Sequence, residues 1–402
     1  MKKNKSAFFL LIFSSFLHSL GYVFIIKKIE PFVYFSYLIF WWTFIAALDS
    51  LLYLRTKRFT VINAYLPETI LVSAAYWGIF EILNVRIQNW FYINIESQVA
   101  LRYGGYLFAY GTVIPALKLM REALKQIWNW ELKIRPVKVR NYPFYAISIG
   151  LFTLFLTFLY PDYFFSFVWV SPLLILDGVN YKRMMGSMFG EMERGEYGNI
   201  LLTSLSGLLC GILWEIWNFW AVAKWVYTVP FFEEWKVFEM PLPGYLGFSF
   251  FALETMAFLN FLEGFGKGKR RAIILTSILV LAISFPLIDR YTVFSFKSHV
   301  GDLHFIEDGK IRYLRSKGVL SSYGVDESVL SQEEKNKLKL MHLYGLGLRN
   351  LKKLERHGID SVEKLSKINE KDLSFILGEK NIRRVRFYLR QAKRAIESAK
   401  DP

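Results

Sequence analysis

The sequence predicts an all-α polytopic membrane protein: two tandem four-helix repeats in parallel orientation, a ninth membrane span and a small C-terminal helical domain. Three observations lead to this prediction. Hydrophobic residues make up 53% of the 402 residues, which is more than a soluble protein usually carries. They gather in long stretches, and short strings with polar residues inside those stretches recur along the chain.

Nine stretches approach the roughly 20 apolar residues that a helix needs to cross the hydrocarbon core of a bilayer. The stretch 164–180 is short and contains Pro172, so a re-entrant segment is the alternative there. The nine predicted spans are 7–26, 32–54, 69–92, 99–120, 142–160, 164–180, 199–227, 243–262 and 272–288.

Basic residues sort the connecting loops. If the N-terminus lies inside, the inner loops contain the basic clusters 55–58, 121–140, 182–194 and 267–271, whereas the outer loops before the tail hold Lys27, Lys28 and Lys236. The positive-inside rule then predicts a multi-pass protein of the cell membrane with a cytoplasmic N-terminus. The net charge of +16 comes largely from these loops and the tail, so it is not by itself a nucleic-acid signal.

Three pairs of similar strings occur in the same order, separated by 128, 134 and 139 residues. A slowly drifting separation is what loop insertions produce in a tandem duplication. Four spans in each copy give both copies the same orientation, the parallel arrangement found in some transporters. The paired strings are 48–55 with 176–183, 80–84 with 214–218, and 105–107 with 244–246.

These strings divide the chain. The first membrane repeat is 1–141, the second is 142–271, and the ninth span is 272–290. The segment 291–337 is predicted to be a linker with a small hairpin over 305–313, because Asp308-Gly309 is typical of a tight turn. Ser331 with Glu334 predicts a capping box at the start of a helix.

The segment 338–402 contains Gly345-Leu346-Gly347, followed by Gly358-Ile359. This pattern resembles the helix-hairpin-helix family over about 338–399, although a second turn near 377–381 has a single glycine. The resemblance implies a compact helical unit whose hairpin can present backbone N–H groups to a phosphate. It implies Gly345, Gly347 and Lys352 as contacts.

The last helix is strongly basic and includes Arg383 and Arg390, with no acidic residue from 380 to 394. Its partner could be a protein, anionic lipid headgroups or a nucleic acid. Nine spans from a cytoplasmic start place the tail outside. We therefore favour a protein partner or the lipid surface over nucleic acid.

The repeated strings place carboxyl and amide groups within the membrane. Glu81 and Asn84 are three residues apart, as are Glu215 and Asn218, so each pair shares one helix face. Ionisable groups in a span are costly and are candidates for a functional site. The alternative is that they hydrogen-bond neighbouring helices and hold them together.

The second copy is richer than the first, which suggests one working site. It adds Glu254 within a span and Lys224 as a counter-charge for Glu215. The predicted catalytic residues are Glu215, Glu254 and Asn218. The predicted substrate-binding residues are Glu81, Asn84, Trp214, Trp217 and Lys224.

A further repeated group lies at the inner membrane boundary. Asp49 with Arg55, and Asp177 with Arg183, are predicted to anchor the helix ends or to bind lipid headgroups. The five histidines are scattered and the chain has one cysteine, so no metal site is predicted. The sequence names no cofactor.

Three functions remain open. The first is an integral membrane enzyme acting on a lipid or isoprenoid; there is a loose similarity to the tandem-repeat membrane carotenoid cyclases at 238–244, where Pro and Gly replace the acidic residues of that family. The second is a transporter or channel that uses the same carboxyl groups. The third is a scaffold that anchors the tail in the membrane, with membrane lipid and a protein as partners.

Overall fold

The computed structural model describes residues 2–232 and 235–398. Within them, seven helices are long and apolar enough to cross a membrane, or eight if one bent pair counts as a single span. The seven helices are α1 (Lys2–Ile26), α2 (Ser36–Thr56), α3 (Leu66–Ile87), α6 (Tyr142–Leu159), α10 (Gly198–Trp220), α11 (Tyr245–Glu263) and α12 (Arg270–Tyr291).

The nine predicted spans are therefore confirmed only in part. The predicted span 164–180 belongs to the bent pair, where 161–169 (α7, Pro161–Phe164, and a short 3-10 turn) meets α8 (Ser171–Lys182) at 41°. The span 99–120 is broken into α4 (Val99–Tyr110) and α5 (Val113–Ile127). The predicted spans 69–92 and 199–227 are too long, because each helix ends earlier and is followed by a strand.

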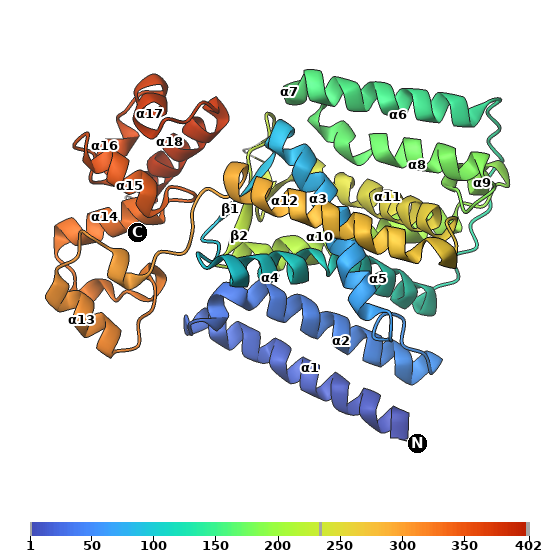
Figure 1. Ribbon diagram of the computed structural model, residues 1–402, viewed down its shortest axis with the longest axis horizontal. Helices are drawn as coiled ribbons and strands as arrows, with labels where there is room; N and C mark the ends of the chain where they lie inside the picture. Colours follow the sequence, from blue (N-terminus) through green and yellow to red (C-terminus); the bar gives the residue numbers. More distant parts are fainter. Residues whose placement is uncertain (1, 233–234, 399–402) are drawn as a thin grey trace.

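Most of the long helices run lengthwise through one bundle, and α3 crosses it obliquely (Figure 1). The N-terminus is at one end of the bundle and the C-terminal domain is at the other. The outer faces of α1 and α6 carry exposed Phe8, Phe16, Phe144 and Phe152. Such a surface is what a helix in contact with lipid needs.

Two short strands form a layer at the tail-side end of the bundle. β1 (Trp90–Ile93) pairs antiparallel with β2 (Lys224–Tyr227). The segment 292–297, which follows α12, adds to β1 in parallel through four backbone hydrogen bonds of 2.7–3.1 Å. A second pair, β3 (Lys236–Val237) and β4 (Met240–Pro241), precedes α11.

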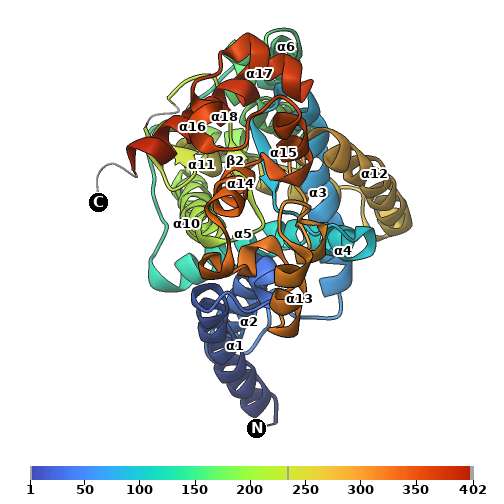
Figure 2. The same ribbon diagram turned by 90° about the vertical axis from the view of Figure 1, so that its left-hand side faces the viewer.

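The C-terminal domain packs directly on this strand layer (Figure 2). Phe91, Ile93 and Val226 belong to its hydrophobic core. Because successive strand residues point to opposite faces, Trp90 and Tyr92 face into the helical bundle. The domain contains α13 (Asp308–Ser316), α14 (Gln332–His342), α15 (Gly347–Glu355), α16 (Val362–Ser366), α17 (Glu370–Leu377) and α18 (Ile382–Glu397).

Two local predictions for the tail have different outcomes. The capping box at Ser331 and Glu334 is confirmed at the start of α14. The hairpin over 305–313 is wrong: Asp308-Gly309 opens the helix α13, and Leu314 of that helix is buried in the domain core.

Candidate functional site: an aromatic cavity between two similar halves

Asp49 and Asp177 are both buried, and both bind backbone N–H groups of the loop that follows their helix. Asp49 accepts hydrogen bonds from Thr60, Val61 and Ile62 at 2.6–2.9 Å. Asp177 accepts hydrogen bonds from the N–H groups of Met188 and Phe189, 11 and 12 residues further along the chain. Thr60 and Val61 follow Asp49 at the same two spacings. The two aspartates therefore bind the protein's own backbone.

The arginines that accompany these aspartates do not share this role. Arg55 and Arg183 are exposed, and the Arg183 guanidinium lies 5.6 Å from the ring of Phe261. The contact of these two exposed arginines with lipid headgroups stays a prediction.

The two amide side chains each clamp the first residues of a strand. Asn84 donates to the carbonyl of Trp90 at 2.8 Å and accepts from the N–H of Asn89 at 2.9 Å. Asn218 donates to the carbonyl of Trp225 at 2.9 Å and accepts from its N–H at 3.0 Å. Both amides are fully buried, so their hydrogen bonds fix where the chain leaves the helix and begins β1 or β2.

The glutamates of the same strings bind tyrosines on these strands. Glu81 accepts from the Tyr92 hydroxyl at 2.6 Å and from the Trp90 indole at 2.9 Å. Glu215 accepts from the Tyr227 hydroxyl at 3.0 Å. The matching strings Trp90-Phe91-Tyr92 and Trp225-Val226-Tyr227 are a fourth repeat signal, separated by 135 residues, that sequence reasoning missed.

The register of β1 and β2 relates the two halves. Phe91 pairs with Val226, Trp90 with Tyr227, and Tyr92 with Trp225. Each residue therefore faces the partner expected if a local two-fold axis passes between Phe91 and Val226. This register and the paired Asp and Glu–Asn contacts fit the tandem duplication that the repeated strings predict, and the duplication itself stays a prediction.

A cavity of about 160 Å³ lies on the inner side of the strand layer, and residues of both predicted repeats line it. Aromatic rings make up most of its wall, and its charged lining residues are Glu96, Arg102 and Lys224. The aromatic lining includes Tyr37, Trp77, Trp90, Tyr92, Tyr106, Tyr110, Trp169, Trp214, Trp225, Tyr227, Phe248 and Phe251.

Two of the predicted site residues, Trp217 and Glu254, lie apart from this group. Trp217 packs on Trp41, with ring centroids 4.9 Å apart, and donates to Tyr22. It is not part of the cavity lining. Glu254 is buried beside Tyr76 of α3.

Lys224 is ion-paired with Glu239 at 2.6 Å and donates to the Tyr344 hydroxyl at 3.0 Å. Glu239, and not Glu215, is therefore its counter-charge. Burial alone would lower the pKa of Lys224, but Glu239 outweighs burial and raises it. The lysine stays charged and ties the strand layer to the tail.

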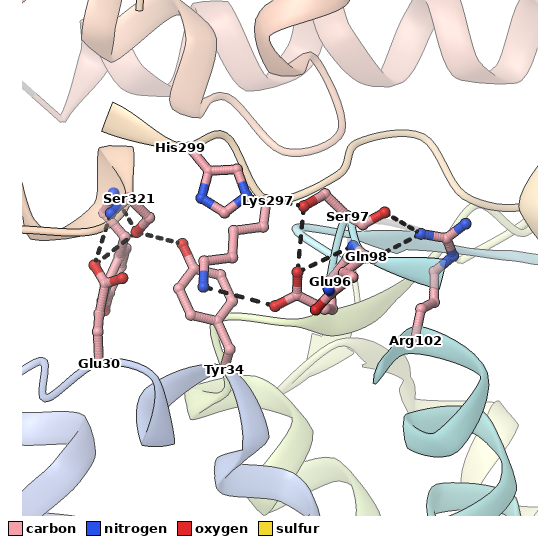
Figure 3. Close-up of polar contacts among 10 residues, drawn as sticks. Glu30, Tyr34, Glu96, Ser97, Gln98, Arg102, Lys297, His299 and Ser321 are labelled. Carbon is pink, nitrogen blue, oxygen red and sulfur yellow. Dashed lines mark hydrogen bonds and ion pairs between the residues drawn. The ribbon is translucent and has the colours of Figure 1, made fainter. Parts of the chain in front are cut away.

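A polar cluster at the tail-side end of the bundle includes Tyr34, Glu96 and Arg102 of the cavity lining (Figure 3). Glu96 lies 3.6 Å from Lys297 of the segment that leads into the tail. Burial acts to raise the pKa of Glu96, but the backbone N–H of Gln98 and the Lys297 ammonium lower it overall. The Tyr34 hydroxyl is 2.8 Å from Ser321, which donates to Glu30.

Arg102 forms the second ion pair at this end. It binds Asp289 of α12 at 2.7 Å and donates to the carbonyls of Glu96 and Ser97. Sequence reasoning missed these residues because the partners are far apart in the chain and no repeated string contains them.

The predicted tail contacts are largely turned towards the membrane part. Gly345 is buried, and a Cβ there would lie 3.1 Å from the rings of Phe91 and Phe294. A Cβ at Gly347 would lie 2.7 Å from Ser295. Both glycines have positive φ, +77° and +66°, which other residues rarely adopt.

The basic residues of the tail differ in their surroundings. Arg383 donates to the carbonyls of Ile87 and Thr228 at 2.8 and 3.0 Å. Lys352 is exposed, and Arg390 lines a cleft. The turn at Gly345 and Gly347 and the Arg383 side chain thus contact the membrane part.

Comparisons with protein-family models, with curated proteins and with solved structures found no match to this chain. Among residues 2–232 and 235–398 there is no group of three or more His, Cys, Asp or Glu side chains placed to hold a metal ion.

Proposed function

We propose that this chain is a membrane enzyme that binds a lipid or isoprenoid in the cavity between its two halves. The wall of the cavity is mainly aromatic. Aromatic faces bury apolar chains well and also stabilise positive charge. An elongated unsaturated ligand suits such a wall.

The observation that carries the proposal is the pair of tyrosines in the cavity wall. Tyr92 and Tyr227 come from the two halves, and each donates to a buried glutamate, Glu81 or Glu215. A hydroxyl backed by a carboxyl group can pass a proton to or from a ligand. We assign the proton-transfer role to these tyrosine–glutamate pairs, and a positioning role to Asn84 and Asn218.

The test has two parts. The purified full chain is extracted with organic solvent, and bound apolar molecules are identified by mass spectrometry. Trp214→Ala should lose the bound molecule, whereas the exposed Trp235→Ala should retain it. Conversion of the identified ligand should fall by about 10²–10⁴-fold in the double variant Tyr92→Phe, Tyr227→Phe. Absence of any apolar molecule from the wild-type extract, or unchanged conversion by the double variant, would overturn the proposal.

A transporter is the second candidate, because buried carboxyl groups at a repeat interface also suit proton coupling. The strand layer and the docked tail lie across the tail-side end of the bundle, which favours the enzyme. Proton-coupled flux in proteoliposomes that is lost in Glu215→Gln would favour the transporter instead. A scaffold role receives less support, because the membrane part of the same chain covers part of the tail's surface.

A further inference from the structure

One face of α4 both lines the aromatic cavity and reaches the protein surface. Leu101, Gly105 and Ala109 line the cavity, and they follow one another at intervals of four residues, so they share one side of the helix. Leu101 is 50% exposed, and Gly105 and Ala109 are partly exposed. Residues that line a cavity and also reach the surface lie at its mouth.

Gly105 leaves open space at this mouth. It stands in the interior of α4, where glycine is less favourable for the helix than alanine is. A Cβ built on Gly105 would meet no atom of the surrounding structure within 4 Å. Close packing of the protein therefore does not explain the glycine, whereas the passage of a ligand beside the helix does.

The two other glycines of the cavity lining face occupied space. A Cβ at Gly244 would collide with the Met240 side chain, and a Cβ at Gly247 would lie 3.5 Å from the Trp169 ring. Gly105 and Gly244 are the glycines of the repeated Gly-Tyr-Leu strings. The corresponding positions therefore differ, and the open one is on α4.

The protein surface around this mouth is apolar. The exposed residues of α4 are Val99, Ala100, Leu101 and Phe108. The helix packs against α2 and α3, which are both long and apolar enough to cross a membrane. Trp42 of α2 donates to the Phe108 carbonyl at 3.2 Å and so ties the two helices together one turn from Gly105. An apolar surface between two such helices suits contact with lipid.

The charge of Arg102, which follows Leu101 in the cavity lining, is already compensated. Its guanidinium binds Asp289 at 2.7 Å and donates to the carbonyls of Glu96 and Ser97. A hydrocarbon chain that passes the mouth therefore does not separate a charge from its partner.

We propose that the ligand enters the aromatic cavity sideways from the lipid, through a mouth at Gly105 of α4. Leu101 and Ala109 border this mouth, and the missing side chain of Gly105 keeps it open. The inference rests on the proposed function, because it takes the cavity as the ligand site. It narrows the ligand to apolar molecules that are dissolved in the bilayer.

The first experiment measures how fast the full chain takes up geraniol, a short isoprenoid alcohol. Proteoliposomes are incubated with geraniol, the protein is recovered at intervals, and bound geraniol is quantified by mass spectrometry. Gly105→Leu should fill the mouth and reach half-occupancy about tenfold more slowly than the wild type. Gly104→Leu is the matched control and should behave as the wild type does, because Gly104 also faces open space but does not line the cavity.

A second measurement tests the surroundings of the mouth without blocking it. A nitroxide is attached to Gly105→Cys in nanodiscs, and the natural Cys210 is fully buried. Oxygen, which concentrates in lipid, should relax this label more than a water-soluble nickel complex does. A nitroxide on Lys371→Cys, at an exposed position of α17, should show the reverse.

The outcomes separate the mouth from the ligand site. The mouth is overturned, and the ligand site is not, if folded Gly105→Leu takes up geraniol as fast as the wild type or if Gly104→Leu is equally slow. Stronger relaxation by nickel than by oxygen at position 105 also overturns the mouth. Geraniol uptake that is equal in Trp214→Ala and the wild type would instead overturn the ligand site on which the inference rests.

Discussion

Asp49 and Asp177 illustrate how single residues act in this protein. Each accepts backbone N–H groups of the following loop and is buried. We expect Asp49→Asn and Asp177→Asn each to lower the free energy of unfolding by about 1–3 kcal/mol, because the amide leaves buried donors unsatisfied. Chemical denaturation in micelles measures this. Asp360→Asn is the control, since its exposed pair with Lys364 is worth less than about 1 kcal/mol. An equal loss of unfolding free energy in Asp360→Asn would contradict the stabilising role of the two buried aspartates.

Glu334 gives a pH-dependent prediction for the tail. Burial acts to raise its pKa, but Lys310 at 2.6 Å and the backbone N–H groups of Ser331 and Glu307 lower it to about 2. The unfolded chain, with a pKa near 4.5, binds the proton first as the pH falls. The stabilisation by this group is thus full above about pH 4.5 and is lost towards pH 2.

Acid titration of the full chain, followed by circular dichroism, should show this loss. Glu334→Gln should flatten the pH dependence between these limits, whereas Glu333→Gln, whose carboxylate is largely exposed, should leave it unchanged. Identical acid profiles for the wild type and Glu334→Gln would rule out the assignment.

The residues of the site could be predicted from the sequence better than their partners could. Helical spacing correctly places Glu81 with Asn84 and Glu215 with Asn218, because residues three apart share a helix face. The partners lie on strands or loops whose position depends on tertiary packing. The sequence therefore predicts that Lys224 pairs with Glu215, whereas the fold brings it to Glu239.

At the scale of elements, the strand layer decides how the two parts of the chain join. Its outer residues Phe91, Ile93 and Val226 are buried in the core of the tail, and its inner residues line the cavity. A short apolar run after an apolar helix has the same pattern as more helix. This is why the predicted spans 69–92 and 199–227 included β1 and β2.

Phe91 offers a direct test of this layer. Phe91→Ala should lower the free energy of unfolding by about 3–5 kcal/mol, because it opens a cavity between β1 and the tail. The ring stacks on Phe294 with centroids 3.8 Å apart. Limited proteolysis should then cleave the tail faster. Phe375→Ala is the matched control, since Phe375 is 82% exposed on α17 of the same domain; equal proteolysis of the two variants would show that Phe91 does not hold the tail.

The α13 segment shows the opposite error. Asp-Gly favours a turn locally, but Leu314 gains burial in the tail core when 308–316 is helical. Tertiary packing overrides a two-residue signal. In contrast, the capping box at Ser331 specifies both partners within one turn, and the helix begins where the sequence predicts.

At the scale of the whole molecule, the two halves are similar in the residues that build the strand layer and different in what surrounds them. Lys224 in β2 corresponds to no charged residue at the start of β1, and Glu254 has no acidic counterpart at Pro115. The tail adds further asymmetry, because it docks at one end of the bundle only (Figure 1). If the chain is a duplicated frame, as the repeated strings predict, these unequal additions favour a single working site.

The bundle also predicts where the two ends of the chain lie. The N-terminus and the connection between α5 and α6 are at one end, and the tail is at the other. Single cysteines introduced at Arg140 and Lys371, both exposed, report on the two ends. The natural Cys210 is fully buried, so its labelling background should be low.

With the N-terminus inside, a membrane-impermeant maleimide applied to intact cells should label Lys371→Cys and spare Arg140→Cys until the cells are permeabilised. The basic residues of the loops on the Arg140 side are the physical reason, because positively charged loops are retained in the cytoplasm. The reverse labelling pattern would mean that the N-terminus lies outside, and it would not contradict the arrangement of the helices. Labelling of both positions from the same side would mean that the tail does not lie across the membrane from the α5–α6 loop, and the bent α7–α8 segment or the broken α4–α5 segment would then fail to cross.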